Sequence, residues 1–411
     1  MVPRSDATLN AKKRQQVVLL NVKFSPNLGD GLLSECLEME LSERLPGSIV
    51  RSVDLAGRVD YSRSSDSARG LMMAALETLP NRIRALASGL LLELLLTFKL
   101  RRHYRTQMRA ASVVVVGGGN LLSDTDLNFP MKIASALRQA KAFHLPVAVY
   151  GVGVLRNWSR RGAKLFGRGL TSQDVFYASV RDYQSSDAWI QQLASYRITD
   201  PIIVTDPGVL ASLHYPRGER SLSGRKVGFC ITNPLAVRYH SKEAYAANLN
   251  EWYVAALRSL VQSDFEVALF TNGSPEDRTY LHEHYRDWIR IAKGPVILVD
   301  SFDNPSDLTS FVSSCEAVIG HRMHACIAAF SYGVPALGLK WDVKLDSFFD
   351  SAGRSAYIVD PSVDAAGEVG SRMQSAIDDS FDPKPLIARS QVELAAFARS
   401  IKEQLGVMHC D

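Results

Sequence analysis

Arg322 and His324 are the residues in this sequence whose types and spacing most clearly favour chemistry. A guanidinium keeps its charge at neutral pH and can hold an anion through two parallel hydrogen bonds. An imidazole gains or loses a proton near neutrality, so it can act as a general acid or a general base. The pair therefore predicts a site that binds an anion and transfers a proton. The alternative is structural, because an arginine and a histidine at a helix start can also cap a carbonyl and pair with a carboxylate.

The elements around this pair support the chemical interpretation. Residues 317–319 are apolar and predict a buried strand, and Gly320 allows the chain to turn as it leaves the sheet. Small residues after the turn predict a close-packed helix that ends at Gly333, before Pro335. Arg322 and His324 should therefore lie at a strand-to-helix junction, which is where open α/β sheets bind ligands.

Polar residues also follow the predicted strands of the first half. Residues 17–22 form an apolar strand, and residues 113–116 are four valines typical of a strand buried on both faces. A glycine after a strand lets a ligand approach the backbone, and a helix start offers unpaired N–H groups. The candidates at these junctions are Asn27, Asp30, Gly118, Gly119, Asn120 and, after a third strand, Arg181. Helix capping, a tight turn and an ion pair with Asp182 remain the structural alternatives.

Strands and helices alternate along the whole chain, which predicts an α/β fold with parallel sheets. At 411 residues the chain exceeds the usual size of a single core, so we expect two Rossmann-like domains that face each other across a cleft. The predicted divisions are a first domain at 1–216, a charged linker at 217–225 and a second domain at 226–384. A final helix at 385–411 is expected to pack back on the first domain.

Composition excludes some classes of function. The chain is 46% hydrophobic and 22% charged, with a net charge of +4, and no stretch interleaves basic and aromatic residues, so we do not expect nucleic-acid binding. Five scattered cysteines without metal-ligand spacing favour the reducing cytosol and predict no metal site. The polar and basic first sixteen residues do not resemble a secretory signal, so we expect a cytoplasmic protein.

Residues 85–109 form the segment with the strongest membrane character. A leucine-rich run is followed by a basic end, but the run is shorter than the roughly 20 residues of a membrane span. The favoured interpretation is a helix that packs on the core or a partner with a solvated basic end. The alternative is a peripheral helix that lies on anionic lipid at the inner face of the membrane.

Five motifs in order give the sequence a family resemblance. They are Asn27-x-Gly29-Asp30, Gly117-Gly118-Gly119 after the valine strand, Ser179-x-Arg181-Asp182, Thr205-Asp206-Pro207, and Gly320-x-Arg322-x-His324-Ala325 followed by Gly333-x-Pro335. Each is weak alone, but in this order over about residues 17–350 the chain resembles the polysaccharide pyruvyl transferase family. Where the family often has Tyr-Asp-x-Lys, this chain has Trp341-Asp342-Val343-Lys344, which bears on any role that needs a phenol.

The resemblance implies a fold similar to the GT-B glycosyltransferases and an enzyme that needs no metal or cofactor. Its donor would be phosphoenolpyruvate, and its acceptor two hydroxyls of a sugar in a bacterial-type exopolysaccharide or cell-wall glycan. The products would be a pyruvate ketal and phosphate. Arg322 and Arg181 would hold the donor anion, and His324 would be the acid or the base, a choice the sequence leaves open. The other substrate-binding candidates are Asn27, Asp30, Gly118, Gly119, Asn120 and Lys344.

Two other functions remain as alternatives at this stage. A nucleotide-sugar glycosyltransferase or epimerase would share the two-sheet cleft. A non-catalytic scaffold for glycan assembly would use residues 90–109 as its contact. The sequence does not distinguish a lipid-linked oligosaccharide from a finished polymer as the acceptor, and it does not specify the sugar, the hydroxyl pair or the oligomeric state.

Overall fold

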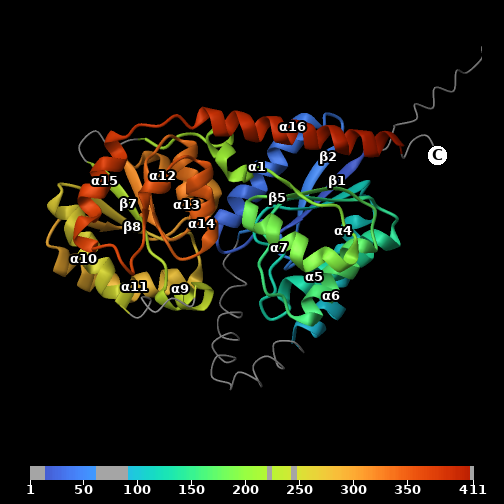
Figure 1. Cartoon of the computed structure of the whole chain (residues 1–411), viewed down its shortest axis with the longest axis horizontal. Coiled ribbons are helices and arrows are strands. Elements are labelled where there is room, and N and C mark those ends of the chain that lie inside the picture. The colour runs from blue at the N-terminus through green and yellow to red at the C-terminus, as the bar shows by residue number, and fades with distance from the viewer. Residues whose placement is uncertain (1–13, 62–90, 220–224, 242–247, 408–411) are drawn as a thin grey trace, which may run out of the picture.

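The computed structural model describes residues 14–61, 91–219, 225–241 and 248–407 (Figure 1). Within these residues the chain forms two six-stranded sheets, in which every strand pairs in parallel with its neighbours. Helices connect successive strands and cover both faces of each sheet. The predicted α/β fold with two Rossmann-like domains is confirmed.

The first sheet has the strand order β2-β1-β3-β4-β5-β6. Its strands are β1 (Gln16–Asn21), β2 (Ile49–Asp54), β3 (Val113–Gly117), β4 (Val147–Val152), β5 (Val175–Val180) and β6 (Ile202–Ile203). The valines of β3 are fully buried, as expected for a strand covered on both faces. One face carries α1 (Leu28–Arg44), and the other carries α4 (Arg101–Met108), α5 (Asn128–Ala142), α6 (Arg160–Thr171) and α7 (Tyr183–Leu193).

The second sheet has the strand order β12-β11-β10-β7-β8-β9. Its strands are β7 (Lys226–Cys230), β8 (Glu266–Phe270), β9 (Val296–Leu298), β10 (Ala317–Gly320), β11 (Ala336–Leu339) and β12 (Ile358–Val359). The face toward the first domain carries α12 (Pro305–Ser314), α13 (Met323–Ser331) and α14 (Val343–Ser351). The helices on the opposite face are α10 (Leu249–Gln262), α11 (Pro275–Ala292) and α15 (Val369–Asp378), and α9 (Pro234–Ser241) follows β7.

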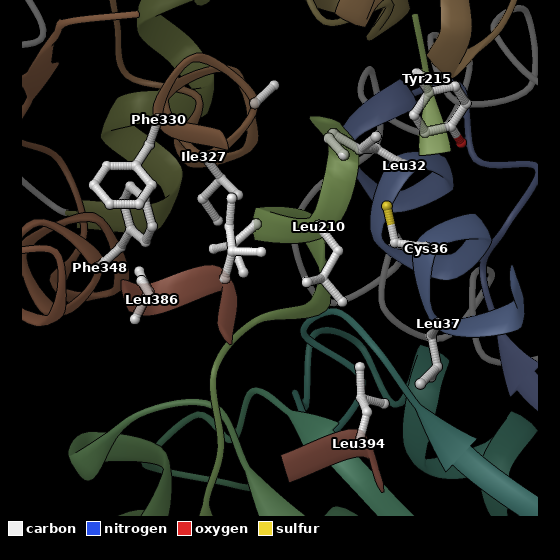
Figure 2. Close-up of a cluster of buried hydrophobic side chains, with 14 of the residues drawn as sticks. Leu32, Cys36, Leu37, Leu210, Tyr215, Ile327, Phe330, Phe348, Leu386 and Leu394 are labelled. Atoms are coloured by element: carbon white, nitrogen blue, oxygen red, sulfur yellow. The ribbon is translucent and has the colours of Figure 1, made fainter. Parts of the chain in front are cut away.

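One hydrophobic cluster joins the two domains. Leu32 and Cys36 of α1 belong to the same buried cluster as Ile327 and Phe330 of α13, as Figure 2 shows. Leu210 of the short 3-10 helix η4 (Pro207–Leu210) is also a member. Polar contacts cross the same boundary, because the Leu28 N–H donates to the Asn272 carbonyl at 2.8 Å. The domains are therefore held together by a buried apolar interface as well as by the connecting chain.

The long helix α16 (Lys384–Val407) runs along both domains (Figure 1). Its Phe397 ring lies with its centroid 4.6 Å from that of Tyr150 and 4.6 Å from that of Tyr177, both in the first sheet. Glu393 accepts a hydrogen bond from the Thr205 N–H at 2.6 Å. The helix thus completes the core on the α1 face of the first domain. In the predicted linker, Arg217 donates to the Tyr332 carbonyl, and residues 220–224 lie outside the described part.

The leucine-rich, basic segment expected at 85–109 is described from residue 91 onward. Residues 91–95 are α-helical and continue through a π-helical turn, η2 (Leu96–Leu100), into α4. Leu96, Leu100, Tyr104 and Met108 are buried, so one side of this helix packs on the first domain. Among the described residues no helix is both long and apolar enough to cross a bilayer.

Candidate active site

The candidate site forms where the carboxyl ends of the two sheets meet the boundary between the domains. In the first sheet the strand order reverses direction between β1 and β3, and in the second it reverses between β7 and β10. Such reversals leave a crevice at the carboxyl edge because neighbouring loops depart to opposite faces. Asp30 and Asn120 follow β1 and β3, and Arg322 and His324 follow β10. The sequence-predicted residues therefore converge on two adjoining crevices.

His324 occupies the start of α13 and packs directly against the start of α1. A Cβ atom built at Gly29 would lie 2.5 Å from the His324 Cβ and 2.6 Å from its Nδ1, so only glycine fits there without movement. The imidazole is almost fully buried, and its Nε2 has no hydrogen-bond partner among the described residues. A neutral imidazole with one unused ring nitrogen can still accept or donate a proton.

The environment keeps the His324 imidazole neutral. Burial lowers its pKa from the ordinary value of 6.5, because the charged form loses its hydration. Asp206 and Asp30 oppose this shift, whereas the positive charges of Arg181 and Lys344 reinforce it. These four charged groups come from both domains and all act on the same ring. The structure thus brings Asp30, Arg181, Lys344 and His324 into one electrostatic neighbourhood.

Arg181 is buried at the end of β5 between two carboxylates. Its Nη1 lies 3.6 Å from Asp206 Oδ2, and its Nε lies 3.5 Å from Asp182 Oδ2. Both distances exceed that of a normal hydrogen bond, so the guanidinium is held by charge more than by direct bonding. A Cβ atom at Gly153 would lie 2.8 Å from Arg181 Nη2 and 2.7 Å from Asn120 Oδ1, so these two side chains meet over that glycine. Asn120 Oδ1 is buried without a hydrogen-bond partner in the described chain.

Arg322 is fixed by a buried carboxylate of the second domain. Its Nε donates to Asp277 Oδ2 at 2.8 Å, and its Nη2 lies 2.6 Å from the same oxygen. Asp277 Oδ1 accepts from the Asn233 N–H at 2.9 Å. The guanidinium also lies 5.3 Å from the centre of the Trp341 ring. Nη1 is not part of the pair with Asp277. The arginine is therefore pre-oriented by Asp277 and Trp341 before any ligand is considered.

The remaining predicted residues also have structural roles, in a helix cap, a turn and an ion pair. Asn27 caps α1, its Oδ1 accepting from the Gly29 N–H at 3.3 Å. Gly118 and Gly119 have φ values of +77° and +75°, a backbone conformation that favours glycine in the turn after β3. Asp30 Oδ1 would lie 3.9 Å from a Cβ at Gly119, so that turn borders the acidic side chain. Lys344 pairs with Asp342 at 3.2 Å.

Comparison with known proteins decides the family. The family model described as "Polysaccharide pyruvyl transferase" matches residues 27–343, which is most of the chain. The chain belongs to the polysaccharide pyruvyl transferase family. No curated protein matches the sequence significantly.

Solved structures agree with the fold of this pyruvyl transferase family member. A UDP-N-acetylglucosamine 2-epimerase from Listeria monocytogenes is 12% identical with a TM-score of 0.51, covering 92% of this chain and 91% of that one. MnaA from S. aureus, solved with UDP, is 11% identical with a TM-score of 0.50 and the same coverage. The expected two-domain, GT-B-like fold is confirmed.

The family member also has a cavity of about 330 Å³ between its domains. Asp182 and Ser185 line it from the first domain, and Trp341 and Asp346 line it from the second. Asp346 Oδ1 is buried without a hydrogen-bond partner in the described chain, and burial raises the pKa of this carboxyl. Since Asp182 contacts Arg181, the cavity adjoins the charged cluster around His324.

Three side chains of the candidate site have no role in the sequence-based prediction. Asp206 lay within a quoted motif, and its place after a strand was the only signal available. Asp277 lies in the first turn of α11, 45 residues before Arg322, and no local pattern indicates that the two are paired. Asp346 lies in the first turn of α14 and is not among the predicted binding residues. Within the described residues, no group of three or more histidine, cysteine, aspartate or glutamate side chains is placed to hold a metal ion.

Proposed function

We propose that this protein transfers the enolpyruvyl unit of phosphoenolpyruvate onto two hydroxyls of a glycan sugar, forming a pyruvate ketal and releasing phosphate. The observation that carries the proposal is the meeting of Arg181 and Asp30 from the first domain with His324 from the second. A neutral imidazole beside buried guanidinium and carboxylate groups suits proton transfer next to an anion. Family membership supports the same class of transferase.

The donor would lie against the cationic side chains of the cluster. Phosphoenolpyruvate carries a phosphate and a carboxylate, and guanidinium groups bind both types of anion with paired hydrogen bonds. Arg181 is held by longer contacts to Asp182 and Asp206, so its donors can turn to a ligand at little cost. Arg322 would contribute Nη1 while Asp277 holds the rest of the guanidinium.

The proton balance assigns a task to His324. The first sugar hydroxyl adds to C2 of the enolpyruvyl unit and gives up its proton, while C3 gains one proton and becomes a methyl group. The second hydroxyl then replaces phosphate at C2, so the C–O bond to phosphate breaks and phosphate leaves with the second hydroxyl proton. Because burial lowers the pKa of His324, its free form is neutral at pH 7, and we assign it as the base that takes a hydroxyl proton.

The acceptor sugar would occupy the cavity between the domains. Its lining offers carboxylates that can accept hydrogen bonds from sugar hydroxyls, among them Asp346 Oδ1, which has no hydrogen-bond partner among the described residues. Trp341 supplies an aromatic surface at the same place. The volume of about 330 Å³ lies in the range of small-molecule sites. Aromatic contact with hydrogen-bonding carboxylates is a combination that suits a carbohydrate.

The test is to incubate the protein with phosphoenolpyruvate and a panel of nitrophenyl and lipid-linked sugars. Released phosphate and the mass of the sugar are then measured. We expect phosphate release coupled to the mass gain of a pyruvate ketal. His324→Gln should lower the rate by about 10²–10⁴-fold, as expected for loss of a general base. His282→Gln is the matched control, because that ring is half exposed on α11 and its Nε2 pairs with the exposed Asp300.

The pH profile separates the two roles of His324. A base must be neutral, so kcat/KM should fall only as the pH drops below the ordinary histidine value of 6.5. A rate that falls as the pH rises through this range would make the residue an acid. Transfer from a nucleotide sugar without any use of phosphoenolpyruvate would refute the proposed function.

A further inference from the structure

The outward side of the helical segment from residue 91 to 109 has a divided surface. Its first part is apolar, with Leu91, Leu94, Leu95 and Phe98 exposed by 37, 47, 37 and 77%. Its second part is basic, and every member is exposed: Lys99, Arg101, Arg102, Arg105 and Arg109. An exposed phenylalanine beside three exposed leucines is unusual on a monomer surface and marks a contact site. We call this surface the 91–109 face.

Contacts on the opposite side of the helix fix where this face lies. Tyr104 Oη donates to the Leu55 carbonyl at 2.6 Å, and a Cβ at Gly57 would lie 2.8 Å from Leu100. Leu55 and Gly57 follow the carboxyl end of β2. Each helical residue advances the chain by about 1.5 Å, so the apolar residues before Leu100 project beyond the carboxyl edge of the sheet. The apolar part therefore lies on the side of the molecule where the substrate cleft opens.

A neighbouring helix extends the positive charge. Glu93 pairs with Arg161 of α6 at 3.1 Å, which places the start of α6 beside the apolar part of the face. The exposed side of α6 carries Arg160, Arg161, Lys164 and Arg168. The whole chain has a net charge of only +4, so these two helices concentrate positive charge on one side of the first domain.

We propose that the 91–109 face docks on the surface of an anionic bilayer. Leu94, Leu95 and Phe98 would enter the boundary between headgroups and acyl chains, as the apolar side of an interfacial helix does. The arginines of α4 and α6 would lie over the lipid phosphates, where each basic residue contributes attraction that salt screens. The charge pattern favours a lipid surface over a protein partner. An anionic bilayer offers acyl chains to the apolar part of the face and phosphates to the arginines beside it. Docking would hold the cleft next to acceptors that are themselves lipid-linked.

The test measures sedimentation of the full chain with lipid vesicles, without any substrate. We expect binding to vesicles of mixed phosphatidylglycerol and phosphatidylcholine, weak binding to phosphatidylcholine alone, and release at high salt. Phe98→Glu should lower vesicle affinity by about tenfold or more, because the phenylalanine that would enter the bilayer is replaced by a charge. Arg101→Gln combined with Arg102→Gln should lower it and reduce its salt dependence.

Val392→Glu is the matched control, because Val392 is 68% exposed on α16, away from the 91–109 face. This variant should bind vesicles as the parent does. Equal vesicle binding by the parent and Phe98→Glu would overturn the proposal. So would self-association in the absence of lipid that Phe98→Glu abolishes, because a second copy would then be the occupant. The readout does not depend on catalysis, so docking can fail while the proposed transfer stands, and the reverse also holds.

Discussion

Two histidines separated by two residues, His321 and His324, are both buried at the start of α13. Burial and the charge of Arg322 lower the pKa of His321 to about 3, with Asp342 opposing. His321 Nδ1 lies 3.2 Å from Tyr253 Oη in the second domain's core, whereas His324 borders Gly29 of the first domain. Only His324 is therefore placed to act in the cleft, and His321 is a neutral packing residue.

These histidines make stability depend on pH. In the unfolded chain they take up protons near 6.5, but in the folded chain their lower pKa values keep them neutral, so the unfolded state binds more protons below that pH. The free energy of unfolding should thus fall as the pH drops from 6.5 toward 3, by up to about 1.4 kcal/mol per pH unit for His321 alone. Urea titrations at several pH values measure this dependence, and the free energy of unfolding of His321→Gln should change less with pH than that of the parent. An unchanged pH dependence would contradict the assignment.

The sequence predicted the site residues that have both a reactive side chain and a place at the end of a strand. Arg322, His324, Arg181 and Asp30 met both conditions, and the structure places them together. Asp277 also lies in the first turn of a helix that follows a strand, but it belongs to none of the five motifs and contributes through its contact with Arg322. A contact between residues far apart in the chain produces no pattern in a single sequence. The sequence therefore could not show that Asp277 orients Arg322.

At the scale of elements, the site depends on how closely the starts of α1 and α13 approach. Gly29 leaves no room between the α1 backbone and the His324 ring. The α1 cap at Asn27 fixes this approach from one side, and the backbone bond from Leu28 to Asn272 fixes it from the other. Two helix starts thus form one rigid junction that sets the position of the imidazole.

Gly29→Ala tests this junction. Its methyl group would lie 2.5 Å from the His324 Cβ, so the helices must separate or the ring must turn. We expect a loss of about 1–3 kcal/mol in the free energy of unfolding, typical of overpacking, together with loss of transferase activity. Gly406→Ala in α16 is the control, because nothing lies within 4 Å of its Cβ position. Urea denaturation and activity assays measure the two effects, and full activity in Gly29→Ala would show that the ring tolerates displacement.

At the scale of the whole molecule, the two domains share a core. Residues of α1, η4, α13 and α16 belong to one buried cluster. Each domain alone would therefore expose apolar side chains at the boundary. The alternation of strands and helices was sufficient to predict two sheets. It could not predict the shared core, because an apolar helix face shows that burial occurs but not which element covers it. Figure 1 shows α16 bridging both halves.

A shared core predicts that both domains unfold together. Phe397→Ala removes the ring that packs on Tyr150 and Tyr177 and should cost about 3–5 kcal/mol. Because that ring belongs to the shared cluster, the thermal transition of the whole chain should shift as one step, as calorimetry can measure. Val392→Ala, at an exposed position on the same helix, should leave the transition in place. Two separate transitions, with only one affected, would show that the domains are independent.

The position of α16 in the chain has a consequence for synthesis. Thr205 and its partner Glu393 are 188 residues apart, and the tyrosines that pack on Phe397 are made earlier still. While the second domain is being translated, the first leaves the ribosome with an aromatic surface that nothing yet covers. Chains grow from the amino end, and exposed apolar surface invites aggregation. This protein therefore completes its first domain last, and we expect the nascent chain to depend on chaperones until residues 384–407 have emerged.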